Sequence, residues 1–392
     1  QFKRSRASTY QSLTIKENLD YQTALTLYLE NNDLPGIIIN TGSRRWYGPI
    51  VSSTAISYRL PTHSSSSPQF PLSLAHILGY TGKINDTEWA NINKKDYLQT
   101  DSLGKTGVEK MYESRLRGTY GKKIIEVDAL EREQTTISVE PPTPGKNITL
   151  TIDLEAQKIL ESALQKTLDK HKKKRGSAIA LNPSTGEVYA LVSLPAFNNN
   201  DFSGGISSGT YASYIQDPDH PLFNRAIGGN FPPGSTLKPV VAAAALEEHI
   251  VTPQTSLLSN GGVKVDRWFF PDWKAGGHGI TNVTKALAWS VNTFFYYVGG
   301  GYQDFKGLGA FKVVQYLERF GLGSKTGIDL PGENKGFVPS PEWKERVKNE
   351  PWYVGDTYNI SIGQGDTLVT PLQVAQWTSV MANGGYQITP HI

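Results

Sequence analysis

The sequence predicts an α+β fold in two domains, and three observations lead to this prediction. The chain has 392 residues, which is more than a usual single domain holds. Leu160, Leu164 and Leu168 recur every four positions, as on the buried face of a helix, and Asp153 precedes them as an N-cap. Two apolar stretches then flank the turn residues 183–186, which is typical of an antiparallel hairpin. A helix packed on antiparallel strands indicates the α+β class.

The first part of the chain, up to about Gly145, has an irregular pattern. Turn-rich stretches separate its short apolar pieces, and the Ser-rich segment 62–68 predicts a mobile loop. Three prolines and Gly145 close this part, so we place a domain boundary there, between residues 1–147 and residues 148–392. The short apolar pieces lie at residues 35–40, 72–80 and 124–127.

The second part follows a clearer order of elements. The basic run 171–175 suits the negative end of the macrodipole of the helix that precedes it, and it is read as a solvated helix end. The polar segment 198–221 predicts a long loop that leads toward the functional site. We expect strands at residues 148–152, 177–181 and 187–193, and further helices at residues 235–249, 283–298, 311–320 and 371–383.

Composition excludes several classes of function. The net charge is only +3 and the basic residues are scattered, so no nucleic-acid partner is expected. The chain has no cysteine, which excludes disulfides, thiolate catalysis and cysteine-ligated zinc. No Gly-rich segment follows a strand as a phosphate loop requires, and no cofactor is expected.

The apolar stretches and the first residue of the sequence bear on membrane attachment. The longest apolar stretches, such as 239–246, are too short to span a bilayer. The sequence begins at Gln1 rather than Met, and we expect a trimmed chain from which a signal or membrane anchor has been removed.

The strongest local signal is a Ser-x-x-Lys pattern at Ser235 and Lys238, which follows Pro-Pro-Gly. A serine hydroxyl needs a base to become nucleophilic, and a residue three positions along a helix lies on the same face. The helix N-terminus adds backbone N–H groups for a developing oxyanion. Partial burial of Lys238 would lower its pKa and let it act as the base.

A structural reading of this pattern remains open, with Ser235 as a helix cap and Lys238 as a surface charge. The segment Ser102 to Lys105 matches the same pattern without a helix. However, the helix after Lys238 is small and apolar enough to be buried, and a lysine at its start needs a reason.

A second element, Ser290-Val291-Asn292, is the only Ser-x-Asn in the chain. A hydroxyl and an amide two residues apart can relay a proton and bind a substrate amide. The alternative is an ordinary polar break between apolar segments. We predict Ser235, Lys238, Ser290 and Asn292 as catalytic residues.

Together these residues resemble the class B penicillin-binding proteins, whose fold and Ser-x-x-Lys motif are shared with β-lactamases. The resemblance covers nearly the whole chain. It implies a non-catalytic pedestal, of the dimerisation type, up to about Gly145, followed by a transpeptidase domain with an antiparallel sheet flanked by helices. Further matching segments are His76-Ile77-Leu78-Gly79-Tyr80, Gly107-Val108-Glu109, Leu150-Thr151-Ile152-Asp153, Gly186-Glu187-Val188, Gly327-Ile328-Asp329-Leu330-Pro331-Gly332-Glu333, Ile362-Gly363-Gln364-Gly365 and Thr370-Pro371-Leu372-Gln373.

Within this family the chain is most similar to the elongation-type subfamily, penicillin-binding protein 2. The segments Asp272-Trp273-Lys274, Gly277-His278-Gly279 and Pro351-Trp352-Tyr353 carry this similarity. It implies an enzyme of the bacterial inner membrane with its catalytic domain on the periplasmic side, held by an anchor absent from this chain. The implied partners are peptidoglycan stem peptides ending in D-Ala-D-Ala, β-lactams, a lipid-linked glycosyltransferase and elongation-complex proteins.

One departure from the family concerns its third motif, a Lys-Thr-Gly strand that lines the cleft. The triplet at Lys105 belongs to the pedestal pattern, and the triplet at Lys325 belongs to a turn. The motif is therefore expected after Ile392, and the transpeptidase domain is expected to be truncated at its C-terminus. We expect a fragment rather than an impaired enzyme.

Two other patterns are rejected as catalytic or metal sites. Residues 205–209 match the Gly-x-Ser-x-Gly nucleophile elbow but lack the preceding strand. Asp272, His278 and Asp266 are possible metal ligands, yet without cysteine or a His-x-x-x-His spacing a hydrogen-bonding role is favoured. We therefore expect no metal.

The resemblance implies acyl transfer in two steps. Ser235 attacks the carbonyl between the two D-alanines of a stem peptide, and an amine of a neighbouring stem then takes the acyl group and forms a cross-link. Two alternatives remain open: a β-lactam-sensing or β-lactam-hydrolysing relative, and a non-catalytic scaffold of the elongation complex.

Overall fold

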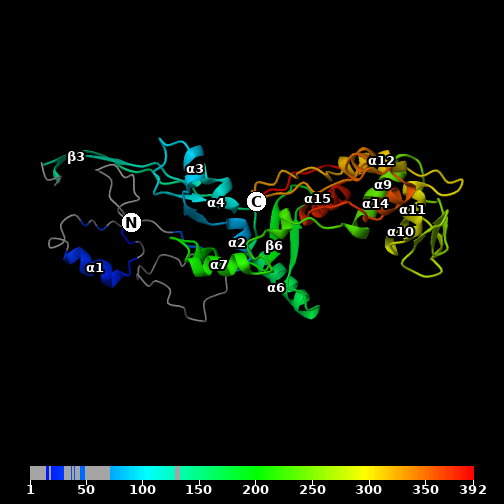
Figure 1. Ribbon diagram of the computed structural model, residues 1–392, viewed down its shortest axis with the longest axis horizontal. Coiled ribbons are helices and arrows are strands. Elements are labelled where there is room, and N and C mark those ends of the chain that lie inside the picture. The colour runs from blue at the N-terminus through cyan, green and yellow to red at the C-terminus, as the bar shows by residue number, and fades with distance from the viewer. Residues whose placement is uncertain are drawn as a thin grey trace.

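The computed structural model describes residues 71–128 and 133–392, together with 15–16, 19–30, 37, 39 and 45–48. Figure 1 shows an elongated molecule with the N-terminal elements at one end and most of the later helices at the other. Every pair of strands formed by the described residues is antiparallel, and helices pack on them. The predicted α+β class is confirmed.

The N-terminal elements are short and pair locally. The strands form two separate ladders, β1 with β2 and β3 with β4. All residues of β3 are exposed, and the β3–β4 hairpin reaches away from the rest of the molecule (Figure 1). The described elements are α1 (Tyr21–Leu29), α2 (Leu74–Leu78), β1 (Thr81–Lys83), α3 (Asp86–Asn91), β2 (Ser102–Gly104), α4 (Gly107–Met111), α5 (Glu113–Leu116), β3 (Lys122–Val127) and β4 (Glu133–Glu140).

Two of the apolar pieces expected in this part lie in regular elements, residues 72–80 around α2 and residues 124–127 in β3. The mobile loop expected at residues 62–68 lies outside the described residues, as does most of the piece at 35–40.

The larger part of the molecule begins with a long helix and continues through a hairpin to a helical region. Its elements are α6 (Leu154–Lys170), β5 (Gly176–Leu181), β6 (Val188–Leu194), η2 (Asn199–Asp201), α7 (Ser208–Gln216), α8 (Arg225–Gly228), η3 (Gly234–Leu237), α9 (Lys238–Glu247), β7 (Leu257–Ser259), β8 (Gly262–Val265), β9 (Trp268–Pro271), β10 (Gly279–Thr281), α10 (Val283–Ala288), α11 (Asn292–Gly300), α12 (Gly309–Arg319), α13 (Pro341–Lys348), α14 (Val354–Ser361) and α15 (Pro371–Ala382).

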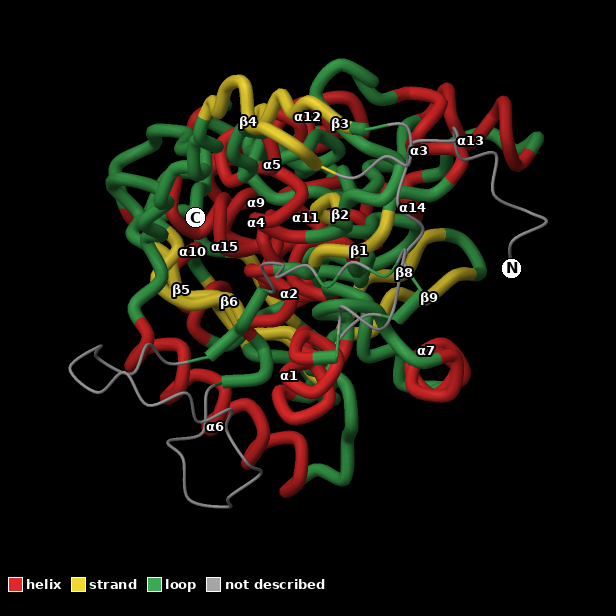
Figure 2. Tube along the Cα trace, turned by 90° about the vertical axis from the view of Figure 1, so that its left-hand side faces the viewer, coloured by secondary structure: helices red, strands yellow, loops and turns green. Residues whose placement is uncertain are grey.

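The helix α6 and the β5–β6 hairpin form as the sequence predicts. The Asp153 carboxylate accepts a hydrogen bond from Ala156 N at 2.8 Å and so caps α6. Leu160 and Leu164 pack on the hairpin residues Val192 and Leu194. Figure 2 shows β5 and β6 beside α6. The helices predicted at residues 235–249, 311–320 and 371–383 are also confirmed, as η3 with α9, α12 and α15.

One apolar core crosses between the two parts of the chain. It joins α2 and α4 to β6 and to residues near the C-terminus, and His391 O accepts a hydrogen bond from Val188 N at 2.9 Å. A second core fills the helical region and is built around α9 and α11. The first core consists of Leu74, Ile77, Val108, Val188, Leu191, Ala226, Ile227, Ile328, Leu330, Leu372 and Ile392.

The strand predicted at residues 148–152 is wrong. This segment is attached to β6 by the Thr151 hydroxyl, which donates to Val188 O at 2.8 Å, and by Asp153 N, which donates to Tyr189 O at 2.9 Å. A side chain thus takes the place of a backbone donor, and no ladder forms.

The long loop predicted at residues 198–221 is also wrong, because it contains η2 and α7. The Ser207 hydroxyl accepts from Thr210 N at 3.0 Å and starts α7. The Phe202 ring stacks on Tyr80 with a centroid distance of 3.8 Å, so the segment packs against the N-terminal elements.

Within the described part of the chain, no helix combines the length and the apolar character that crossing a bilayer requires.

Candidate active site

Ser235 lies in a tight turn between two backbones. Gly234 has a φ of 57° and donates its N–H to Gly363 O at 2.8 Å. A β-carbon on Gly363 would lie 2.0 Å from Gly234 O, so only glycine fits at this contact. The turn leads into η3 and α9, and it leaves Ser235 exposed at the start of a helical segment, where backbone N–H groups lack intrahelical acceptors.

Lys238 follows one turn later and is almost completely buried, with 1% of its surface exposed. The residues Val240 and Val241 of α9 lie in the core of the helical region and hold this part of the chain inside. Burial lowers the pKa of Lys238 to about 8, while the charge of Asp272 acts in the opposite direction. A lysine with this pKa exchanges protons near neutral pH, as a general base must.

The ammonium group of Lys238 has three acceptors, all from one short segment. Its Nζ donates to Ser290 O at 2.8 Å, to Ser290 Oγ at 3.0 Å and to Asn292 Oδ1 at 2.6 Å. Ser290 Oγ in turn donates to Ser235 Oγ at 2.8 Å. Within the described part of the chain Ser235 Oγ makes no direct hydrogen bond to Lys238 Nζ, so Ser290 lies between the two.

The position of Ser290 depends on an interruption between the helices α10 and α11 that the sequence did not reveal. The single helix predicted at residues 283–298 is wrong, since α10 ends at Ala288 and α11 begins at Asn292. Ser290 has a φ of 52°, in the left-handed region that residues other than Gly, Asn and Asp rarely adopt. A continuous helix would turn positions 290 and 292 to different faces, whereas the break lets both side chains reach Lys238.

The segment after β9 supports this break. The Asp272 carboxylate accepts from Thr293 N at 2.8 Å and from Thr293 Oγ1 at 2.6 Å. Burial alone would raise the pKa of Asp272, but these hydrogen bonds hold it below its ordinary value. The Trp273 indole N–H donates to Trp289 O at 3.0 Å and to Ser290 O at 3.1 Å.

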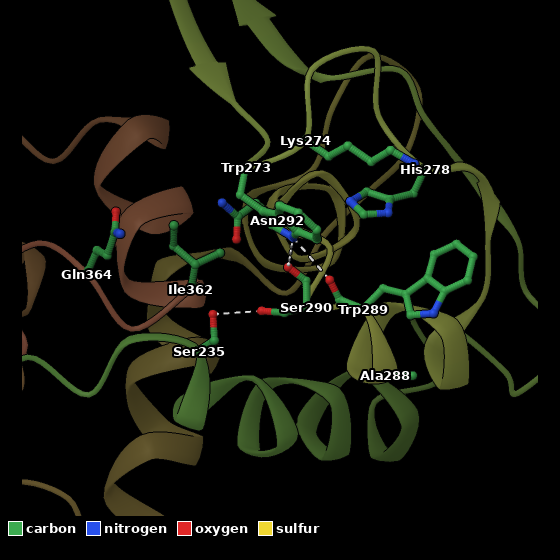
Figure 3. A pocket seen from close by; sticks show the side chains of 10 residues that line it. All are labelled: Ser235, Trp273, Lys274, His278, Ala288, Trp289, Ser290, Asn292, Ile362 and Gln364. Atoms are coloured by element: carbon green, nitrogen blue, oxygen red, sulfur yellow. Dashed lines mark hydrogen bonds between the residues drawn. The ribbon is translucent and has the colours of Figure 1, made fainter. Parts of the chain in front are cut away.

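An open pocket of about 890 Å³ is bordered by Ser235, Ser290 and Asn292, and its size suits a small ligand or a peptide end. Figure 3 shows the side chains of Ser235 and Ser290 pointing toward each other, with Asn292 and Trp273 close to Ser290. The full lining of the pocket is Ser235, Trp273, Lys274, His278, Ala288, Trp289, Ser290, Asn292, Ile362 and Gln364.

The four residues predicted as catalytic are thus brought together in one hydrogen-bonded group, next to the pocket. No local sequence pattern pointed to a site role for Trp273, Trp289, Ile362 or Gln364. Of these, Trp273, Ile362 and Gln364 lie in segments that carry the family resemblance, which was the available signal.

The rejected patterns lie elsewhere. Ser207 caps α7 and is preceded by turns, not by a strand. The Lys325 triplet is part of a turn, in which the Thr326 N–H donates to Glu333 at 2.6 Å. Neither it nor the Lys105 triplet lines the pocket.

The suggested metal ligands do not converge. Asp272 is occupied by the hydrogen bonds given above, and its Oδ1 lies 3.7 Å from His278 Nε2. Asp266 lies in the exposed turn between β8 and β9. Among the described residues, no group of three His, Cys, Asp or Glu side chains could hold a metal ion.

Comparison with known protein families gives two matches. Residues 176–392 match the penicillin-binding protein transpeptidase domain, and residues 1–150 match the penicillin-binding protein dimerisation domain.

Individual relatives agree with the family matches. The peptidoglycan D,D-transpeptidase MrdA of Acinetobacter baumannii is 40% identical over 320 residues, which are 81% of this chain and 46% of that protein. MrdA of Escherichia coli K12 is 34% identical over 400 residues, covering 99% of this chain and 57% of that protein. The chain therefore spans about half the length of the curated relatives it matches.

The solved complex between penicillin-binding protein 2 and MreC from Helicobacter pylori is similar in structure. The TM-score is 0.80 at 32% sequence identity, and the match covers 99% of this chain and 66% of that chain. The similarity therefore extends over the N-terminal elements as well as the pocket.

Proposed function

The chain belongs to the penicillin-binding protein transpeptidase family, and from this premise we propose that it is a serine-type peptidoglycan D,D-transpeptidase with Ser235 as its nucleophile. One observation carries the proposal. An exposed serine hydroxyl is connected through Ser290 Oγ to Lys238, a buried lysine whose pKa is lowered by burial to about 8.

In the first step Ser235 Oγ attacks the carbonyl carbon between the two D-alanines of a donor stem peptide. The Ser235 proton passes to Ser290 Oγ as the Ser290 proton passes to neutral Lys238 Nζ, so both hydrogen bonds reverse their direction. The C–N bond then breaks, and the leaving D-alanine amine takes the proton back from the lysine.

In the second step an amine of a neighbouring stem peptide attacks the acyl-enzyme. The same relay removes a proton from this amine and returns one to Ser235 Oγ as the ester bond breaks. The product is a cross-linked peptide, and the enzyme regains its starting protonation. Asn292 Oδ1 accepts from Lys238 and orients it for both steps.

The pocket supports the same assignment. It opens beside Ser235 and is bordered by exposed indole rings and by Gln364, whose amide can bind a peptide group. A β-lactam ring presents a strained amide in place of the D-Ala-D-Ala bond, so we propose that β-lactams acylate Ser235.

The experiment is intact-protein mass measurement after incubation with a penicillin. We expect one adduct of the drug mass on the chain and none on Ser235→Ala. An adduct on Ser235→Ala would exclude Ser235 as the nucleophile. Absence of any adduct, also on the full-length gene product, would favour the alternative of a non-catalytic scaffold.

The proposal extends to partners and location, because the chain belongs to the penicillin-binding protein transpeptidase family. We propose that the transpeptidase domain comprises residues 148–392 and that residues 1–147 form a pedestal which binds other proteins of the cell-wall elongation machinery. The similarity to a structure that contains MreC supports this role for the complete protein. A membrane anchor, a periplasmic catalytic domain and a lipid-linked glycosyltransferase partner complete the proposal.

A further inference from the structure

The segment Ser290-Val291-Asn292 holds an unfavourable backbone conformation that requires support. Ser290 lies at a positive φ of 52° between two helices. The residue at the N-cap of α11, Val291, has no side chain able to cap it, and no side-chain cap is formed there. Without another contact, the chain would be expected to relax toward the ordinary helical region.

Asp272 supplies the missing cap from a different element. Its carboxylate accepts from Thr293 N at 2.8 Å and from Asn292 N at 3.4 Å, both in the first turn of α11. The residue is only 7% exposed, and Trp273 N donates to it at 2.8 Å, which fixes the carboxylate from the other side.

Trp273 holds the residues immediately before the helix. Its indole N–H is shared between Trp289 O at 3.0 Å and Ser290 O at 3.1 Å. The same Ser290 carbonyl accepts from Lys238 Nζ at 2.8 Å. One carbonyl therefore links the tryptophan to the buried lysine.

We propose that Asp272 and Trp273 are positioning residues for acylation, which fix Ser290 and Asn292 at hydrogen-bond distance from Ser235 and Lys238. The proposal rests on the proposed function of Ser235. Asp272 accepts hydrogen bonds from backbone N–H groups at the start of α11, and Trp273 donates to the carbonyl of Ser290, the left-handed residue before it. The two residues therefore hold the segment between α10 and α11 from both ends. Two distances in the resting site depend on these contacts. Ser290 Oγ lies 2.8 Å from Ser235 Oγ and 3.0 Å from Lys238 Nζ.

The carboxylate has a second effect, on the base itself. The charge of Asp272 raises the pKa of Lys238, against the larger lowering by burial. Asp272 is also faced by His278 Nε2 at 3.7 Å, and its charge contributes to raising the pKa of Tyr296 on α11. Removal of the Asp272 charge therefore shifts the pH dependence of acylation to lower pH, whereas a loss of folding alone would not move it.

The test measures acylation of the full-length gene product by a fluorescent penicillin, with the affinity of the first complex separated from the rate constant of the covalent step. Trp273→Phe keeps an aromatic ring but removes the N–H donor. We expect the covalent rate constant to fall about tenfold, since a hydrogen bond to a key carbonyl is lost, while the affinity changes by less than about threefold. Trp268→Phe, on the exposed strand β9, is the matched control and should leave both values unchanged.

Asp272→Asn is the second variant, with Asp266→Asn in the exposed β8–β9 turn as its control. We expect a covalent rate constant lower by about tenfold and a pH midpoint displaced to lower pH, because a charge-assisted cap becomes a neutral one. Should Asp272→Asn fail to fold, Trp273→Phe alone decides, since its side chain is 63% exposed and fills no core space.

The outcomes separate the two proposals. If wild type is not acylated, or if Ser235→Ala still is, the proposed function fails and this inference falls with it. If wild type is acylated through Ser235 but folded Trp273→Phe keeps the wild-type covalent rate constant, the positioning role is overturned while the proposed function stands.

Discussion

The hydroxyl group of Ser290 donates a hydrogen bond of 2.8 Å to the hydroxyl oxygen of Ser235. This contact joins two residues that are 55 positions apart in the sequence. Ser290 Oγ also accepts a hydrogen bond from Lys238 Nζ, so Ser290 connects the exposed Ser235 to the buried lysine. We therefore expect proton removal from Ser235 to depend on a second hydroxyl group, that of Ser290.

Ser290→Ala tests this dependence. Without the intermediate hydroxyl the proton has no short path to Lys238, and we expect acylation by a penicillin to slow by about a hundredfold or more. Stopped-flow or gel-based measurement of acylation gives the rate, and Ser213→Ala on the exposed side of α7 is the control. A folded Ser290→Ala protein with wild-type kinetics would show that the relay is not used.

The pH dependence of acylation follows from Lys238. The group acts as a base only when neutral, and burial lowers its pKa to about 8. The acylation rate should therefore rise with pH through about 8 and level off above it, rather than near the ordinary pKa of about 10.4 for a lysine. Lys238→Arg, which stays protonated, should abolish the rise and most of the activity; a residual profile with the same midpoint would point to another base.

Gly363→Ala tests the backbone contact beside Ser235. Both Gly363 and Gly384 have positive φ, at 75° and 84°, but only Gly363 would place a β-carbon against another backbone, 2.0 Å from Gly234 O. We expect Gly384→Ala to lower the free energy of unfolding by about 1 kcal/mol, the penalty for the left-handed conformation. Gly363→Ala should lower it by at least about 2 kcal/mol and also impair acylation, because the clash adds to that penalty and displaces the turn of Ser235.

Chemical denaturation with urea measures both variants. Equal losses of stability in the two alanine variants would mean that the contact between Gly363 and Gly234 is not tight in solution.

We expect the free energy of unfolding to depend on pH through His76. Burial, with a smaller effect from Arg225, lowers the pKa of His76 to about 4, against a hydrogen bond to Pro195 that acts the other way. The unfolded chain takes up this proton near pH 6.5, whereas the folded chain does so only near pH 4. The unfolded state therefore binds more protons between these values, and stability should fall as the pH decreases from about 6.5 to about 4, by up to roughly 3 kcal/mol.

Melting temperatures across this range measure the effect. His76→Gln should flatten the decline, although its absolute stability is lower because the edge-on contact with Phe197 is lost. His171→Gln, in an exposed position after α6, should keep the wild-type slope. An unchanged slope in His76→Gln would assign the acid sensitivity to other groups.

Local patterns predicted much of this structure. Asp153 caps α6 because the side chain and the amide it binds are only three residues apart, and the turn at 183–186 closes the β5–β6 hairpin by contacts between near neighbours. The spacing of Ser235 and Lys238 is a local pattern as well, but Ser102 and Lys105 share it, and the Pro-Pro-Gly turn and the small apolar helix that follows were needed to single out the pair.

Features that depend on distant contacts were not predicted. The apolar run from Val283 to Val298 has the composition of one helix, but contacts from Asp272 and Trp273 lie where it is interrupted at Ser290. The helix α7 was missed because it is short and largely polar, and its Tyr214 packs in a cluster that includes Ala75 and Tyr80 of the N-terminal elements. In both cases the deciding partner lies far away in the sequence, where periodicity gives no information.

The apolar core shared by the two matched regions limits how this protein can be dissected. Leu74, Ile77 and Val108 lie against Val188 and Leu191, which are completely buried. A recombinant fragment that starts at residue 148 would expose this apolar interface to solvent, which favours self-association. Limited proteolysis should likewise release no soluble fragment that contains the pocket until this shared core unfolds, so binding assays and crystallisation trials are best served by protein that retains residues 71–147.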